Sequence, residues 1–110
     1  MGTRYIIVES ASASRLLAEH YRANDLEGLE RLYRHLREDT RLIANSFRAS
    51  GFTVLNCAGI NVTAHSADPL ATDDMLIDGV RSLTRAPLDF RAGIGTTLAE
   101  AFNVLHHHRC

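Results

Sequence analysis

The chain has 110 residues, of which 45% are apolar and 23% are charged, and its formal net charge is −1. This length allows one domain over residues 1–110 with one hydrophobic core, and it is too short for two domains of ordinary size. The composition excludes the low hydrophobicity and high net charge of disordered chains. The charge also lacks the basic footprint of proteins that bind long nucleic acids through their phosphates.

The cysteine content and the chain start indicate a cellular compartment. Two cysteines, Cys57 and Cys110, do not suggest a disulfide framework, and this fits a reducing cytoplasm. No signal-like segment precedes the first predicted strand, and no apolar run approaches the roughly 20 residues that span a bilayer. We therefore expect a cytoplasmic protein that does not enter a membrane.

The first half of the chain predicts one strand and two helices. Residues 5–8 form a short apolar run rich in β-branched residues, which is typical of a buried central strand. Ser12 or Ser14 can cap the helix that follows. Asn24-Asp25 opens a longer helix that Gly51 ends. The apolar stripe of that helix consists of Leu26, Leu29, Leu32, Leu36, Ile43 and Phe47.

The next segments predict a hairpin and a third helix. Phe52–Asn56 and Ile60–Ala64 flank Cys57-Ala58-Gly59, and the short spacing with a glycine favours a tight turn. Behind the pair Asp73-Asp74, whose charges suit a helix N-terminus, apolar residues recur at helical spacing. Pro87 closes this connection.

The end of the chain predicts a fourth strand, Leu88–Ile94, and a last helix capped by Thr97. The order is then β-α-α-β-β-α-β-α, which is a ferredoxin-like β-α-β-β-α-β core with one additional helix after each half. We expect an α+β palm whose four-stranded, mostly antiparallel sheet is covered by helices on one face.

Several strings in this order are similar to a known family. They are Tyr5-Ile6-Ile7-Val8, Asn24-Asp25-Leu26-Glu27-Gly28-Leu29, Ser50-Gly51-Phe52 and Phe90-Arg91-Ala92-Gly93-Ile94-Gly95-Thr96-Thr97-Leu98. Together they resemble the minimal CRISPR polymerase family, whose members are small relatives of the GGDEF diguanylate cyclases. The resemblance implies a palm fold, synthesis of cyclic nucleotide signals in anti-phage defence, and two divalent ions held at the first strand and the central hairpin.

The chain departs from this family at the metal-binding positions. After the first strand, where the family has an Asp-rich run, only Glu9 offers a carboxylate, and Ala11 occupies a ligand position. At the hairpin, Ile60 occupies a ligand position and Asn61 offers only a neutral carbonyl. Because Mg²⁺ sheds its water reluctantly and needs charge compensation, we expect no metal site and no cofactor. Asp68, Asp73, Asp74 and Asp78 are predicted before and within the third helix, at a distance from the hairpin turn. The alternative is that one of these four carboxylates supplies the missing metal ligand.

The remaining candidate residues suit a phosphate. Backbone N–H groups of Ser10, Ala11, Ser12, Ala13 and Ser14 could cradle an anion at a helix start, beside Ala58 and Gly59 of the hairpin turn. The resemblance adds Arg109, at the position of a phosphate-contacting lysine. The alternatives are an ordinary capped turn for the serine run, a surface or capping charge for Glu9, and a helix-dipole role for Arg109.

Three other features have ordinary explanations. Inert packing is expected of Cys57, because buried cysteine usually behaves as a small hydrophobe. A solvated helix end is expected of His106–His108, because consecutive helical residues cannot all bind one ion. Gly93 and Gly95 are expected to permit a close turn between the last strand and the last helix.

The leading interpretation is a pseudoenzyme, a palm that binds a nucleotide, a cyclic nucleotide or a protein partner such as an effector or an active palm relative. The alternatives are a still-active synthase that uses ATP, GTP and Mg²⁺, and a purely structural dimerisation module. We also expect a homodimer, because the related cyclases bring two active sites face to face. Its surface would be the exposed side of the first two helices, at Leu17, Tyr21, Leu29 and Tyr33.

Overall fold

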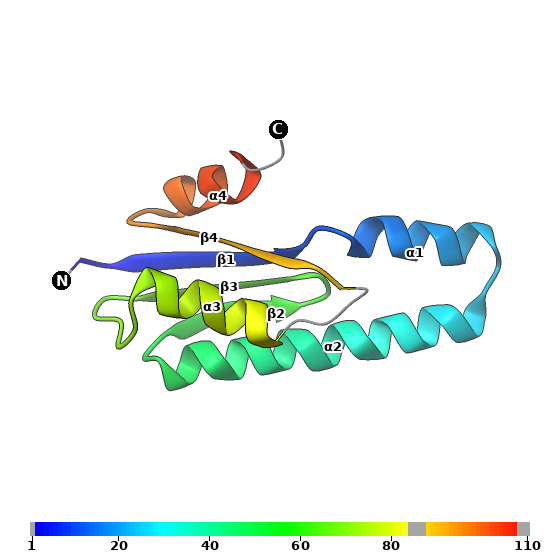
Figure 1. Cartoon of the computed structure of the whole chain (residues 1–110), viewed down its shortest axis with the longest axis horizontal. Helices are drawn as coiled ribbons and strands as arrows, with labels where there is room; N and C mark the ends of the chain where they lie inside the picture. Colours follow the sequence, from blue (N-terminus) through cyan, green and yellow to red (C-terminus); the bar gives the residue numbers. More distant parts are fainter. Residues whose placement is uncertain (1, 84–87, 108–110) are drawn as a thin grey trace.

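The computed structural model describes residues 2–83 and 88–107, with eight elements in those ranges. They are β1 (Arg4–Ser10), α1 (Ala13–Arg22), α2 (Leu26–Ala49), β2 (Thr53–Ala58), β3 (Asn61–Ser66), α3 (Asp73–Leu83), β4 (Phe90–Gly95) and α4 (Leu98–His107). The predicted order of strands and helices is confirmed (Figure 1). Pro87 and Arg109 lie outside the described residues.

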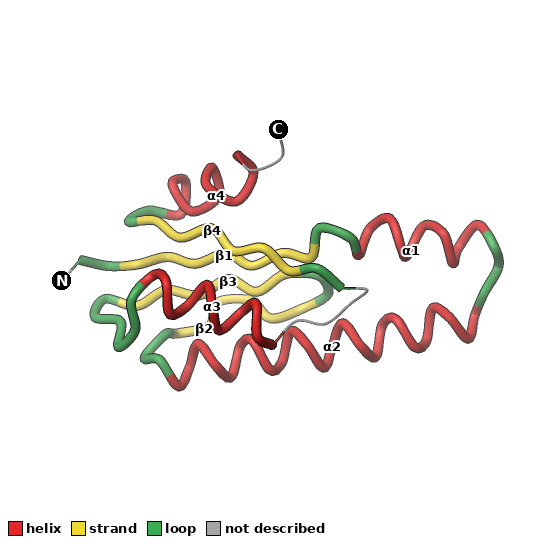
Figure 2. Tube along the Cα trace, viewed as in Figure 1, coloured by secondary structure: helices red, strands yellow, loops and turns green. Residues whose placement is uncertain are grey.

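The four strands form one sheet in the order β2-β3-β1-β4, and all of the described strand pairs are antiparallel (Figure 2). The first strand is central because β3 and β4 flank it. The α+β class and the four-stranded antiparallel sheet are therefore confirmed. No helix in the described ranges has both the length and the apolar character needed to cross a membrane.

The hairpin between β2 and β3 has a tight turn, as predicted. Gly59 adopts a φ of 62°, a left-handed conformation that a glycine accepts without steric cost. Further along β2, the register with β3 shifts between Val54 and Asn56, so Leu55 forms a bulge and is 54% exposed. The pairing of β1 with β4 runs without such a shift from Tyr5 to Ser10.

One face of the sheet packs on α2 and α3 and forms the core. Alternate residues of the central strands, including Ile6, Val8, Val62 and Ala64, are fully buried on this face. They pack in one cluster with apolar residues of α2 and α3, namely Leu32, Leu36, Ile43, Ala44, Phe47, Leu76 and Val80. The stripe predicted for α2 is therefore the core stripe over most of its length.

The last helix packs on the opposite face, so the prediction that helices cover only one face is wrong. Its Ala101 and Leu105 are buried over β4, and it also contacts β1. The approach depends on two glycines, because a Cβ on Gly93 would lie 2.2 Å from the Ala101 carbonyl oxygen. A Cβ on Gly95 would lie 2.7 Å from the Glu100 side chain. These glycines therefore permit close packing of a helix rather than a turn.

The first helix and the beginning of α2 extend past the end of the sheet, which gives the molecule a longest dimension of 49 Å (Figure 1). Asn24 joins the two helices in a left-handed conformation with a φ of 52°. Leu26, predicted as part of the core stripe, is 67% exposed because this part of α2 lies beyond the sheet.

Candidate functional site

The end of β1 and the start of β3 place three polar side chains in a row across the sheet. Glu9 is directly opposite Asn61 of β3 on one side and Arg91 of β4 on the other. Directly opposite residues point to the same face of a sheet. Gly93 is two residues from Arg91 along β4 and therefore points to the same face. Since Gly93 lies against α4, this is the face that carries α4. We call Asn61, Glu9 and Arg91 the Glu9 row.

A histidine of α4 lies next to the Glu9 row. The Nε2 atom of His106 is 4.0 Å from Oε2 of Glu9, and the two side chains retain only 29% and 24% of their exposure. The ring of Phe102, one turn earlier, packs on the imidazole with centroids 4.2 Å apart. The predicted solvated helix end is therefore wrong for His106, while His108 lies outside the described residues.

Asn61 is held from the other side of the row. Its side-chain oxygen accepts a hydrogen bond from the amide nitrogen of Asn56 on β2. The amide of Asn61 is thus fixed beside Glu9, and its oxygen already has a donor.

The serine-rich loop after β1 uses part of its backbone for structure. The Ser10 N–H donates to the Ile60 carbonyl at 3.0 Å, and the Ala11 N–H donates to the Asp89 carbonyl at 2.8 Å. The Ser10 side chain is 3% exposed, and its hydroxyl has no hydrogen-bond partner among the described residues. The loop therefore joins β1 to the hairpin turn and to the segment before β4.

The start of α1 leaves part of the other predicted anion-binding groups at the surface. Ser12 precedes α1 and accepts a hydrogen bond from the Asp89 N–H at 3.3 Å, so its side chain does not cap the helix. The first bond of the helix runs from the Leu16 N–H to the Ser12 carbonyl. N–H groups of the first turn, including that of the exposed Ser14, therefore have no partner within the helix. The side chain of Ala13 is buried, whereas Ala11 and Ser14 are exposed.

The two positions that the resemblance assigns to metal ligands meet at this same end of the sheet. The hydrogen bond from Ser10 to Ile60 brings the hairpin turn against the end of β1, one residue before Ala11. Ile60 is partly buried against the core, and Gly59 is exposed at the turn next to Ala58. The apolar side chains of Ala11 and Ile60 provide no metal ligands.

The acidic residue at the start of α3, Asp73, lies at the opposite end of the sheet. Asp73 is 3.4 Å from Arg4 at the start of β1, and Glu9 is five residues further along, roughly 17 Å away at the rise of a strand. Among the described residues, no three His, Cys, Asp or Glu side chains are close enough to hold one metal ion. Since Mg²⁺ requires several oxygen ligands, the Glu9 row does not fit the ion that the resemblance implies.

Cys57 lies on β2 with an exposed thiol rather than a buried one, and its sulfur is 3.5 Å from the Thr40 carbonyl. Its strand neighbour in β3 is the buried Val62, so Cys57 points toward α2 and away from the Glu9 row.

Two residues of this site, Arg91 and His106, were not assigned to it from sequence. For Arg91 the available signal was strand pairing, because a fourth strand beside β1 places one of its residues opposite Glu9. For His106 the available signal was indirect, because its position depends on the face that α4 covers, and Gly93 and Gly95 leave one side of β4 without side chains.

The predicted dimer surface on the first two helices is only partly exposed. Tyr21 and Tyr33 are 59% and 38% exposed, and their hydroxyl groups share a hydrogen bond of 2.7 Å. Leu17 and Leu29 are half-buried.

Comparison with known proteins gives no assignment. No protein-family model matches the chain, and no curated protein matches it at a significant level.

Proposed function

We propose that this chain is a palm-type domain that binds a nucleotide through its phosphate groups without a divalent metal ion and does not catalyse nucleotidyl transfer. The strand order β2-β3-β1-β4 supports the palm assignment, since a ferredoxin-like palm also brings the first strand beside the central hairpin. The proposal places the domain in cyclic nucleotide signalling of anti-phage defence, as the resemblance implies.

The observation that carries this proposal is the composition of the Glu9 row. Where a catalytic palm needs several carboxylates, Glu9 lies between the amide of Asn61 and the guanidinium of Arg91, with His106 at 4.0 Å. A guanidinium repels a divalent cation and attracts a phosphate. The row thus keeps one carboxylate and places hydrogen-bond donors on both sides of it.

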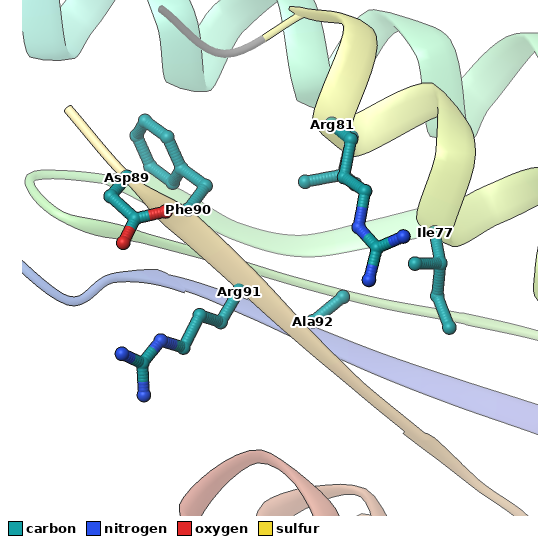
Figure 3. Close-up of a pocket in the computed structure, with 7 residues that line it drawn as sticks. Ile77, Arg81, Asp89, Phe90, Arg91 and Ala92 are labelled. Atoms are coloured by element: carbon teal, nitrogen blue, oxygen red, sulfur yellow. The ribbon is translucent and has the colours of Figure 1, made fainter. Parts of the chain in front are cut away.

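Arg91 is the residue that we assign to the phosphate. Its side chain is exposed and points away from α3, toward the face that carries α4 (Figure 3). A guanidinium binds phosphate oxygens through two parallel N–H bonds, which a neutral amide cannot do. The first turn of α1, which begins three residues after the end of β1, adds outward N–H groups and a favourable helix dipole.

Calorimetry with ATP, GTP and a cyclic dinucleotide, in EDTA and then in Mg²⁺, tests the proposal. We expect micromolar binding that EDTA does not abolish and that Arg91→Ala weakens at least tenfold, which corresponds to about 1.4 kcal/mol. Arg48→Ala is the matched control because Arg48 is an exposed arginine near the end of α2 that donates a hydrogen bond to Asn45. Binding that requires Mg²⁺, or that both variants weaken equally, would contradict the assignment.

Two other functions give different results in related assays. An active synthase would form cyclic or linear oligonucleotides from ATP and GTP with Mg²⁺ or Mn²⁺, and Glu9→Ala would abolish the product. A purely structural module would bind none of the nucleotides at micromolar concentration. The proposed domain binds nucleotide and forms no product.

A further inference from the structure

We propose that the outer edge of β4, which pairs with no described strand, is a docking surface for the same strand of a second copy, so that two sheets join in antiparallel fashion about a two-fold axis. The order β2-β3-β1-β4 leaves β2 and β4 as the two edges of the described sheet. An edge strand presents backbone N–H and C=O groups that can pair with another chain. This inference rests on the backbone of β4 and not on the proposed nucleotide binding, with which it shares the Arg91 side chain.

The two edges differ in how well they can accept another strand. The bulge at Leu55 interrupts the regular spacing of β2, and bulges at edges hinder pairing. The register of β4 is regular from Gly95 to Phe90. Pairing is therefore favoured at β4.

The backbone groups on the free side of β4 can be assigned from its neighbours. The Ser10 N–H points to β3 and the Ala11 N–H points to the segment before β4. The N–H groups of successive residues point to opposite sides of a strand. Since the Ala11 N–H points toward β4, the N–H groups of the other odd-numbered residues of β1 also bond to β4. Their partners in β4 are Arg91, Gly93 and Gly95. Phe90, Ala92 and Ile94 consequently direct their N–H and C=O groups away from β1, toward an incoming strand.

A groove of about 460 Å³ runs along this edge between β4 and α3 (Figure 3). Its apolar wall consists of Ile77, Val80, Phe90 and Ala92, while Arg81, Asp89 and Arg91 also line it. A strand added to the edge would place every second side chain in this groove. In an antiparallel second copy these side chains are Phe90, Ala92 and Ile94, which are all apolar. Phe90 is buried in the single chain, and Ala92 and Ile94 are half-buried.

The charges around β4 favour an antiparallel copy of the same strand. Arg91 lies near the beginning of β4, and the Glu100 side chain lies over Gly95 at its end. In an antiparallel pair, the start of one β4 lies beside the end of the partner's β4. Each Arg91 therefore lies near the Glu100 side chain of the partner. Both ends of the interface then receive one pair of opposite charges.

Sedimentation equilibrium of the full chain, combined with two variants at one position, tests this surface. We expect the natural chain to dimerise and Ala92→Pro to weaken the association constant at least tenfold. Proline removes the outward N–H of residue 92 and leaves the bonds between β1 and β4 intact. Ala92→Ser keeps the N–H with a similar volume and should change the constant less than twofold. Thermal unfolding by circular dichroism verifies that both variants fold.

A second measurement needs no variant. Amide hydrogen exchange at Phe90, Ala92 and Ile94 should slow as protein concentration rises. A monomer at every concentration would overturn the proposal, as would exchange at these amides that does not depend on concentration. A dimer that survives Ala92→Pro but is lost with Tyr21→Ser plus Tyr33→Ser would instead place the interface on α1 and α2, and it would equally overturn the β4 edge.

Discussion

Gly93 lies directly against the backbone of Ala101, so that a Cβ at position 93 would stand 2.2 Å from the Ala101 carbonyl oxygen and 2.6 Å from the Leu105 nitrogen. Both contacts are with backbone atoms, which cannot rotate away as a side chain can. We expect Gly93→Ala to lower the free energy of unfolding by about 2–3 kcal/mol, because α4 must shift from β4.

The control for this change is another glycine in an open environment. Gly79 lies within α3, and a Cβ there would meet only the Ser46 hydroxyl at 3.9 Å. Gly79→Ala should therefore raise the free energy of unfolding by about 0.5–1 kcal/mol through helix propensity and the entropy of the unfolded chain. Urea unfolding measures both variants, and equal effects would contradict the close packing of α4.

The carboxylate of Asp25 is expected to make stability depend on acid pH. A hydrogen bond from the Gly28 N–H at 2.9 Å, and then one with His20 at 3.0 Å, hold the pKa of Asp25 below its ordinary value of 3.8. Because the folded-state pKa is lowered, the stabilisation is present above the unfolded pKa and is lost as pH falls through the folded pKa.

Thermal unfolding between pH 7 and pH 2 measures this contribution. The natural chain should lose more stability below its ordinary Asp pKa than Asp25→Asn does, since asparagine can still cap the helix but does not titrate. If the stability of the two proteins fell equally with pH, the Asp25 cap would not be the origin of the acid dependence.

The hydrogen bond between Tyr21 and Tyr33 is expected to appear in an alkaline titration. This bond raises the pKa of Tyr33 above its ordinary value of 10.0. The stabilisation is present below the unfolded pKa and is lost as pH rises through the folded pKa. Phenolate absorbance should show Tyr33 returning to its ordinary range in Tyr21→Phe. Tyr5→Phe is the control, and it should leave the titration of Tyr33 unchanged.

A buried carboxylate in α2 is expected to be important for stability. Asp39 is 0% exposed, and His35, one turn earlier, places Nε2 at 3.3 Å from its Oδ2. Asp39→Ala removes one partner of a buried polar pair, and we expect a loss of about 3 kcal/mol in urea unfolding. Glu38→Ala, at the exposed neighbouring position, should change stability by less than about 0.5 kcal/mol. Similar effects of both changes would contradict a specific role for Asp39.

The sequence predicted the order of the elements because each local pattern has a distinct period. The β-branched run at residues 5–8 predicts a strand, and its Ile6 and Val8 belong to the core. The stripe from Leu32 to Phe47 follows the helical period and is also part of the core. The cap of the last helix was also predictable, since Thr97 accepts a hydrogen bond from the Glu100 N–H at 3.0 Å. Local patterns could not predict that Leu26 is exposed, because its environment depends on how far α2 extends past the sheet.

The candidate site was less predictable because it depends on contacts between distant segments. The resemblance to palm enzymes implied that Glu9 and Asn61 lie near one another, and in the structure they are strand partners. The position of His106 beside Glu9 requires α4 to cross to the second face of the sheet, and a periodic pattern does not say which face a helix covers. The spacing of Gly93 and Gly95 on one side of β4 was the signal for that face.

The bulge in β2 has a consequence for the size of any assembly. A sheet that could pair at both edges would grow into an open polymer, since each added copy would offer a new edge. With Leu55 displaced from the ladder, the second edge does not repeat the spacing that β4 requires. An assembly joined at β4 as proposed would therefore stop at two copies, and it would be closed rather than fibrous.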